Sequence, residues 1–296
     1  MPNLRSDAVS SVPSSHGARI ALLTVVAMLA FAGNSLLCRL ALKGTQIDAA
    51  SFTLVRIASA ALVLGVILLA RGGDRSSARR AGSWRSALAL IVYAMAFSFA
   101  YVRLAAGAGA LLLFGAVQAT MIGYGIATGE RLAVVQWLGL LLALAGLVWL
   151  VLPGLAAPEP LSSALMIVAG VGWGVYSLRG RGQTDPVAAT AGNFLRALPF
   201  AVAVSALAFT TARFDRAGVV YAAASGALTS GLGYVVWYAA LKGLKPAVAA
   251  TVQLSVPVIT AAGGVLLLGE ALTARLAASS VAILGGIALV VLPKRH

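Results

Sequence analysis

Long apolar segments are the feature that most restricts how this chain can fold. A helix needs about 20 apolar residues to cross the roughly 30 Å hydrocarbon core of a bilayer. Ten segments meet this requirement, at residues 19–42, 48–70, 84–103, 106–128, 132–152, 161–180, 186–211, 217–241, 246–268 and 273–293. Only 10% of all residues are charged, against roughly 25% in a soluble domain. The sequence therefore predicts an all-α integral membrane protein with ten transmembrane helices.

The distribution of basic residues predicts how the helices are oriented. The chain has 22 Lys and Arg against 8 Asp and Glu, and Lys and Arg concentrate in the cytoplasmic loops of membrane proteins. Most of them fall on one side if both termini are cytoplasmic, chiefly in the loop at 71–80 and near the ends of the chain. We therefore expect a multi-pass protein with both termini in the cytoplasm, and the topology explains the basic excess without a nucleic-acid partner.

An internal repeat divides the chain into two similar halves. Gly129-Glu130 recurs as Gly269-Glu270, and the same shift of 140 residues pairs Arg56 with Arg196. Each half then holds five helices, and because five is odd the second half enters the membrane from the opposite side. Such inverted repeats are typical of secondary transporters. The predicted organisation is a polar tail, two five-helix repeats and a second tail, at 1–18, 19–154, 155–293 and 294–296.

Short motifs in three of the segments resemble those of the EamA-type drug/metabolite transporter family. They are Phe31-Ala-Gly-Asn34-Ser-Leu-Leu-Cys-Arg39, Phe52-Thr-Leu-Val-Arg56 and Phe194-Leu-Arg196. The resemblance extends over residues 19–293 and implies a bacterial inner-membrane protein with ten helices in two five-helix repeats. It also implies export of small metabolites.

Aromatic residues at helical spacing are the first candidates for a substrate site. Three of them recur every fourth residue in one segment and so share a helix face, and others occupy the sixth and eighth segments. Flat aromatic rings can line a cavity that binds apolar groups, but rings near helix ends also anchor proteins at the membrane interface. The candidates are Tyr93, Phe97, Tyr101, Trp173, Tyr176, Tyr234 and Trp237.

Three amides within apolar segments are the next candidates, namely Asn34, Gln118 and Gln253. Polar groups at membrane depth face protein or a water-filled cavity, and they can either bind substrate or hold helices together by hydrogen bonds. Gln118 and Gln253 have no amide at their repeat-related positions, Val258 and Leu113. A structural role would more naturally appear in both halves, so a role in substrate binding is kept open for each amide.

Other residues are predicted to support structure or gating. Arg56 and Arg196 could attract a substrate carboxylate, but their occurrence in both repeats favours a structural tether to the carbonyls at a helix end. Glu130 and Glu270 are expected to cap helix starts, where a carboxylate complements the positive end of the helix dipole, and the turns they occupy could act as pivots. Pro257 is expected to interrupt the ninth helix and free a carbonyl near the midplane.

The positions of the acidic residues indicate the energetics of transport. All eight lie in tails, loops or helix ends, whereas proton-coupled carriers usually need a titratable group within the membrane. The sequence thus predicts facilitative export of aromatic and other hydrophobic amino acids by alternating access. The alternative is export of another small metabolite or a toxic organic compound, with or without proton coupling.

Two histidines, one in each tail, and one cysteine cannot form a metal cluster or a membrane-embedded catalytic pair. We therefore expect no enzymatic activity, no metal and no cofactor. A monomer in the lipid bilayer would satisfy the two-repeat organisation.

Overall fold

The computed structural model describes residues 15–72, 80–129, 131–152, 157–180, 183–241, 243–244 and 252–291. Most of the predicted tail at 1–18, the tail at 294–296 and Glu130 lie outside these residues. Helices account for the regular secondary structure of the described residues. They are α1 (Ser15–Gly44), α2 (Ala49–Ala70), α4 (Trp84–Tyr101), α5 (Ala106–Ala127), α6 (Val134–Val151), α7 (Pro160–Gly180), α8 (Pro186–Leu207), η1 (Phe209–Thr211), α9 (Arg216–Ala224), η2 (Ser225–Leu232), α10 (Gly233–Leu241), α12 (Ser255–Leu268) and α13 (Ala274–Val291).

Eight of the described helices are long and apolar enough to cross a membrane. One of them is the continuous stretch Arg216–Ala240, in which η2 is a π-helical segment between α9 and α10. The shorter apolar helices α12 and α13 lie in the predicted ninth and tenth segments. The prediction of an all-helical membrane protein is thus confirmed, while the count of ten spans stays a prediction.

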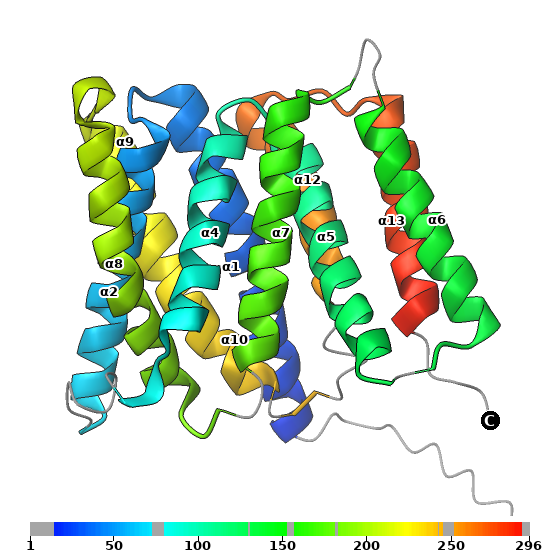
Figure 1. The fold of residues 1–296 in the computed structure, drawn as a ribbon, viewed down its shortest axis with the longest axis horizontal. Coiled ribbons are helices and arrows are strands. Elements are labelled where there is room, and N and C mark those ends of the chain that lie inside the picture. Colours follow the sequence, from blue (N-terminus) through cyan, green and yellow to red (C-terminus); the bar gives the residue numbers. More distant parts are fainter. Residues whose placement is uncertain are drawn as a thin grey trace, which may run out of the picture.

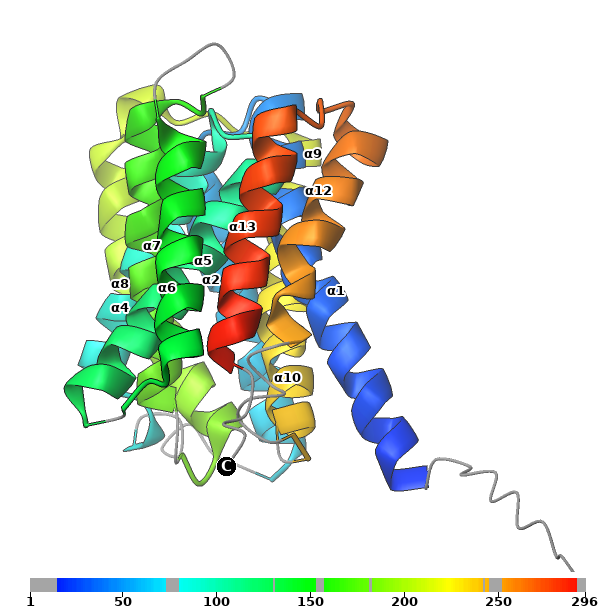
Figure 2. The same ribbon diagram turned by 90° about the vertical axis from the view of Figure 1, so that its right-hand side faces the viewer.

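The helices stand side by side in one bundle, and their connections lie at its two ends (Figure 1). We call these the upper and lower ends, as they appear in that view. α1 begins and α13 ends at the lower end, which places both on one side of the bundle. Viewed from the side, α1 diverges from the other helices toward its lower end (Figure 2).

Packing is most extensive between α6 and α13 and between α4 and α7, followed equally by α2 with α8 and α5 with α7. α1 contacts both α10 and α12, while α7 contacts both α4 and α5. The outer faces carry large exposed apolar side chains, such as Leu138, Leu141 and Val148 on α6. In a bilayer these side chains meet lipid, and the helical backbone satisfies its own hydrogen bonds there.

Candidate substrate site

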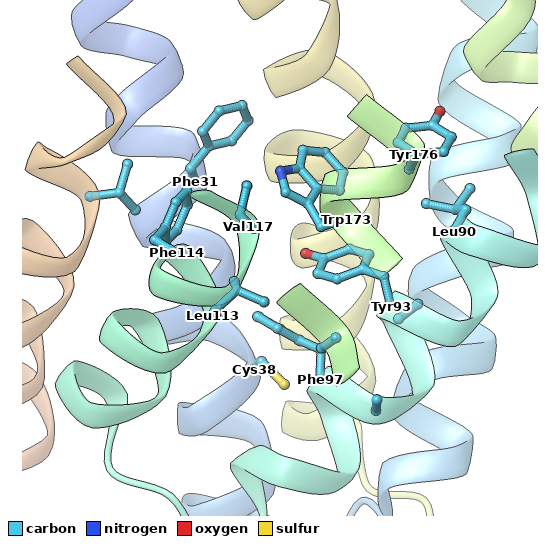
Figure 3. Close-up of a cluster of buried hydrophobic side chains, with 14 of the residues drawn as sticks. Phe31, Cys38, Leu90, Tyr93, Phe97, Leu113, Phe114, Val117, Trp173 and Tyr176 are labelled. Carbon is cyan, nitrogen blue, oxygen red and sulfur yellow. The ribbon is translucent and has the colours of Figure 1, made fainter. Parts of the chain in front are cut away.

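Aromatic side chains from four helices meet in the middle of the bundle. Trp173 on α7 lies 5.0 Å from Tyr93 on α4 and 4.9 Å from Tyr234 on α10, measured between ring centroids. Phe31 on α1 contacts Trp173 and Tyr234 edge-on at 6.2 and 6.1 Å. Figure 3 shows Phe31, Tyr93 and Trp173 converging from their helices. These four rings, which we call the aromatic cluster, come from both predicted repeats.

A small cavity lies within this cluster. It has a volume of about 20 Å³ and is lined by Phe31, Asn34, Ser35, Tyr93, Leu113, Phe114, Trp173 and Tyr234. A cavity of this size holds about one water molecule. The rings are in contact with one another, so a larger molecule can bind only if they move apart.

Asn34 organises the polar wall of this central cavity. Its Nδ2 donates a hydrogen bond of 3.1 Å to the hydroxyl of Tyr93. Its Oδ1 accepts hydrogen bonds from Ser225 Oγ at 2.7 Å and Thr229 Oγ1 at 3.2 Å. The amide therefore joins α1 to α4 and to η2, and its orientation is fixed from both sides.

Arg56 on α2 lies behind Tyr93 and is 1% exposed. Its Nη2 donates to the Tyr93 hydroxyl at 2.9 Å, and its Nε donates to Ser230 Oγ at 3.3 Å. The guanidinium carbon is 5.1 Å from the Tyr93 ring centroid and 4.9 Å from that of Phe97. Arg56 was expected to bind backbone carbonyls at a helix end. Its side chain instead points into the bundle, where its neighbours are side-chain hydroxyls and aromatic rings.

Arg196, which the repeat pairs with Arg56, has different surroundings. Its Nη1 donates to the carbonyl of Gly192 on its own helix at 3.0 Å, and its guanidinium carbon lies 5.9 Å from the Trp84 ring centroid. Arg196 is partly exposed, whereas Arg56 is fully buried. The two arginines match in sequence but differ in burial and in the contacts given above.

The π-helical segment η2 carries the hydroxyls that contact Asn34 and Arg56. A π-helix has i→i+5 hydrogen bonds and a wider turn than an α-helix, and such segments are frequent at functional sites. Gly226 lets η2 pack directly on α2, because a Cβ atom there would overlap the Arg56 carbonyl oxygen and Ser59 Oγ. The close approach brings Ser230 within reach of Arg56.

Four other predicted aromatic residues surround the cluster without lining its cavity. Phe97 lies between Tyr93 and Tyr101, with centroid separations of 5.4 and 4.8 Å. Tyr101 is buried near the upper end, and its hydroxyl donates to the Ala106 carbonyl at 3.3 Å. Trp237 contacts Phe31 at 5.8 Å, and Tyr176 contacts Trp173 at 5.6 Å.

Two of the predicted amides lie away from the aromatic cluster. Gln118 is buried but lines a separate cavity of about 20 Å³ between α5, α6 and α13. Gln253 is half-buried just before α12 and is not among the residues that line the central cavity. Asn34 contacts the cluster directly, through its hydrogen bond to the Tyr93 hydroxyl.

Pro257 lies in the first turn of α12, because this helix begins at Ser255. The first four backbone N–H groups of a helix have no intrahelical partner. The missing N–H of a proline at this position therefore interrupts no hydrogen bond. Residues 252 and 253 are helical and Leu254 lies in a turn, so the ninth segment is interrupted three residues before Pro257, while α12 itself is continuous.

A second, more polar cavity of about 120 Å³ opens at the lower end. Its lining includes Ser86, Tyr176, Arg179 and Asn193 from α4, α7 and α8. Arg179 Nε donates to Ser86 Oγ at 3.0 Å. Tyr176 lines this lower cavity while its contact Trp173 lines the central one, so these two rings lie between the cavities.

The upper end is held together by an ion pair. Arg39 Nε at the end of α1 lies 3.0 Å from Glu270 Oε1, and both side chains are nearly buried. Arg39 Nη1 also donates to the carbonyls of Tyr101 and Val102 at 2.8 and 3.0 Å. Glu270 Oε2 accepts the backbone N–H of Ala106 at 2.7 Å. The carboxylate thus caps the start of α5, a neighbouring helix, and joins three parts of the bundle.

Several central residues were not among the predicted candidates. Phe31 appeared only within a family motif, and Ser225, Thr229 and Ser230 were not selected. These three hydroxyls stand close together inside one apolar segment, which is a signal that could have found them. Within the described residues, no group of three or more His, Cys, Asp or Glu side chains is placed to hold a metal ion.

A bundle of membrane-length apolar helices defines the chain as a multi-pass membrane protein. The profile of the EamA-like transporter family matches residues 161–292. A Pseudomonas aeruginosa protein, described as uncharacterized protein PA1977, is 57% identical over 276 residues, which make up 93% of this chain and 96% of that protein. The chain belongs to the EamA-like transporter family, whose members transport small metabolites across membranes.

A solved crystal structure shares the fold of this chain. The two superpose with a TM-score of 0.66 at 20% sequence identity, and the match covers 92% of this chain and 96% of the other. At this level of identity the likeness concerns the fold alone.

Proposed function

We propose that this protein exports amino acids, in particular aromatic and other hydrophobic ones, across the bacterial inner membrane. The observation that carries the proposal is the aromatic cluster, which encloses a central cavity with rings from both halves of the chain. Tilted and edge-on rings favour a flat apolar side chain. The sequence also resembles bacterial exporters such as the aromatic amino acid exporter YddG, which is consistent with this substrate class.

Transport is proposed to proceed by alternating access between two inverted repeats. The bounds of α6 and α13 differ by the repeat shift of 140 residues at both ends. The same shift pairs α1 with α7, α4 with α10 and α5 with α12. Correspondingly, α7 contacts α4 and α5, and α1 contacts α10 and α12. The Arg39–Glu270 pair closes the upper end, while the larger cavity lies at the lower end. In alternating access, each of the two exchanging states is closed at one end and open at the other, and this asymmetry fits one such state.

We propose that no proton accompanies the substrate. The described carboxylates, Asp48, Glu159, Asp185, Asp215 and Glu270, all lie at or between helix ends. A carrier without a titratable carboxylate in its membrane interior has no obvious proton-binding site there. Substrate would then move down its own gradient.

Counterflow into proteoliposomes tests this proposal. Vesicles preloaded with unlabelled phenylalanine are placed in labelled phenylalanine without any ion gradient, and accumulation of label is expected. Trp173→Ala should reduce the accumulation about tenfold or more, because it removes the ring that contacts Phe31, Tyr93 and Tyr234. Trp137→Ala is the matched control, since Trp137 is 46% exposed on the outer face of α6; it should leave the accumulation unchanged.

The outcomes separate the parts of the proposal. Accumulation only after a pH gradient is imposed would contradict facilitative transport but leave the substrate class standing. No accumulation of phenylalanine, tryptophan or leucine under either condition would refute amino acid transport. The same assay with other metabolites would then identify the substrate.

A further inference from the structure

Arg56 is a buried charge whose hydrogen-bonding capacity is only partly used. A guanidinium carries five N–H donors and no acceptor. The Nε and Nη2 atoms of Arg56 have hydroxyl partners, but Nη1 is buried and has no hydrogen-bond partner among the described residues. The rings of Tyr93 and Phe97 attract the positive charge, yet they offer no acceptor to Nη1.

No carboxylate of the described residues neutralises this charge. The ion pair found there, Arg39–Glu270, lies at the upper end and leaves Glu270 fully engaged. Arg56 instead has neutral hydroxyls around it, at Tyr93 and Ser230. A buried charge is costly unless it is both paired and hydrogen-bonded. The missing partner of Arg56 is therefore an anion that the described residues do not supply.

Tyr93 connects Arg56 to the central cavity. Tyr93 lines that cavity, and its hydroxyl oxygen accepts hydrogen bonds from both Arg56 Nη2 and Asn34 Nδ2. No described residue accepts the hydrogen of the Tyr93 hydroxyl. Arg56 on α2 and Asn34 on α1 thus both donate to the Tyr93 hydroxyl at one side of the aromatic cluster. Arg56 Nη1 and the Tyr93 O–H are left without an acceptor among the described residues.

We propose that Arg56, together with the Tyr93 hydroxyl, binds the carboxylate of the transported molecule. This inference rests on the proposed function, and it narrows the substrate class to carboxylates. A guanidinium matches a carboxylate through paired hydrogen bonds. The described part of the cavity offers no acidic side chain to an ammonium group, so the amino group of an amino acid is not the recognised feature. Apolar acids that lack the amino group bind as tightly as the amino acid or more tightly.

Binding to the purified full-length protein tests the proposal without any need for transport. Four ligands form the panel: 3-phenylpropionate, its neutral isostere 3-phenylpropanamide, 2-phenylethylamine and the aliphatic acid hexanoate. Calorimetric titration gives the Kd of each. We expect 3-phenylpropionate to bind about tenfold or more tightly than the amide, since hydrogen bonds to a charged group contribute about 1.5–3 kcal/mol. The amine should bind no better than the amide.

Variants of Arg56 test whether this residue causes the preference for the acid over the amide. Arg56→Gln should reduce the ratio of the two affinities, acid over amide, to about one, and Arg56→Lys should leave an intermediate ratio because it keeps the charge without the planar fork. Arg275→Gln is the matched control, because Arg275 also lies over a ring, that of Trp149, but on the exposed outer side. It should leave the ratio unchanged.

The panel also separates this inference from the proposed function. If the amide binds the wild-type protein as tightly as the acid, or if no acid binds, carboxylate recognition is refuted. If hexanoate binds and 3-phenylpropionate does not, the carboxylate site stands and the preference for aromatic substrates fails. Should Arg56→Gln fail to fold, the acid-to-amide ratios of the wild type and of Arg56→Lys still decide the matter.

Discussion

At the scale of single residues, Asp48 joins two connections at the upper end. Its Oδ1 accepts the N–H groups of Ala50 and Ser51 at 2.9 and 3.0 Å and thereby caps α2. Its Oδ2 accepts the N–H of Arg213 at 2.8 Å. Partial burial raises the pKa of this carboxyl, but the hydrogen bonds from Arg213, Ser51 and Ala50 together outweigh it, so the pKa lies below its ordinary value.

Asp48→Ala should lower the free energy of unfolding by about 1 kcal/mol or more at neutral pH, as the loss of a helix N-cap does. Because the folded-state pKa is lowered, the carboxylate stabilises the protein above its unfolded pKa of about 3.9. That contribution is lost as the pH falls through the folded-state pKa. Thermal unfolding in detergent, followed by tryptophan fluorescence, should show wild type and variant converging in acid. A difference in Tm that stays constant with pH would argue against this role of the charge.

Residue type predicted several members of the site, whereas depth within an apolar segment did not show which polar residues face it. The sequence singled out Asn34, Tyr93, Trp173 and Tyr234, and the structure brings these four together around one cavity. It also singled out Gln118, whose polarity and depth in its segment resemble those of Asn34. Asn34 and Gln118 differ in the direction that their helices turn them, because the face of α5 that carries Gln118 is turned toward α6 and α13. An apolar segment without a clear polar stripe does not reveal that rotation.

At the scale of elements, η2 depends on contacts that no local sequence pattern encodes. The segment 217–241 reads as one uninterrupted helix, and the structure places a π-helical turn within it. Hydrogen bonds from Ser225 and Thr229 to Asn34 and the close packing of Gly226 on α2 hold this turn. Both come from helices distant in sequence, so the turn was not predictable from the segment alone.

Gly226→Ala tests how closely η2 must approach α2. The added methyl group would overlap the Arg56 carbonyl oxygen and force the helices apart, and overpacking of this kind typically costs about 1–3 kcal/mol. We expect a lower Tm in detergent. Gly65→Ala on α2 is the control, since a Cβ atom there meets no atom within 4 Å. Equal effects of the two substitutions would contradict the close-packing argument.

At the scale of the whole molecule, the two ends of the bundle differ. The upper end is closed by the Arg39–Glu270 pair and its bonds to the α4–α5 connection, whereas the lower end contains the larger cavity. Hydropathy alone predicted the membrane-spanning helices, because the bilayer imposes their length and composition. The difference between the ends depends on charges that meet across 231 residues of chain, and hydropathy carries no information about such contacts.

Glu270→Gln should open the upper end. Breaking a buried ion pair by removing one partner costs about 3–5 kcal/mol, which corresponds to a change of more than tenfold in population. A single cysteine at Leu104, buried in the α4–α5 connection, would report the opening through its reaction with a polar maleimide in a Cys38→Ala background. Labelling should become about tenfold faster or more.

Glu159→Gln is the control for this measurement. Glu159 lies at the same end and accepts the N–H groups of Leu161 and Ser162 at the start of α7, but it is only half-buried and forms no ion pair among the described residues. It should leave the labelling rate unchanged. An unchanged rate in Glu270→Gln as well would mean that the ion pair does not hold the upper end closed.

The unpaired guanidinium of Arg56 has a consequence for how membrane voltage acts on transport. If this fixed positive charge stays in place while its ligand leaves, each molecule crosses the membrane with its own net charge. A zwitterionic amino acid then carries no net charge, and its flux is independent of voltage. An acid without the amino group crosses as a monoanion, and an interior-negative potential drives it outward by about 2.3 kcal/mol per 100 mV. A carrier without proton coupling would thus still export such acids against a concentration gradient.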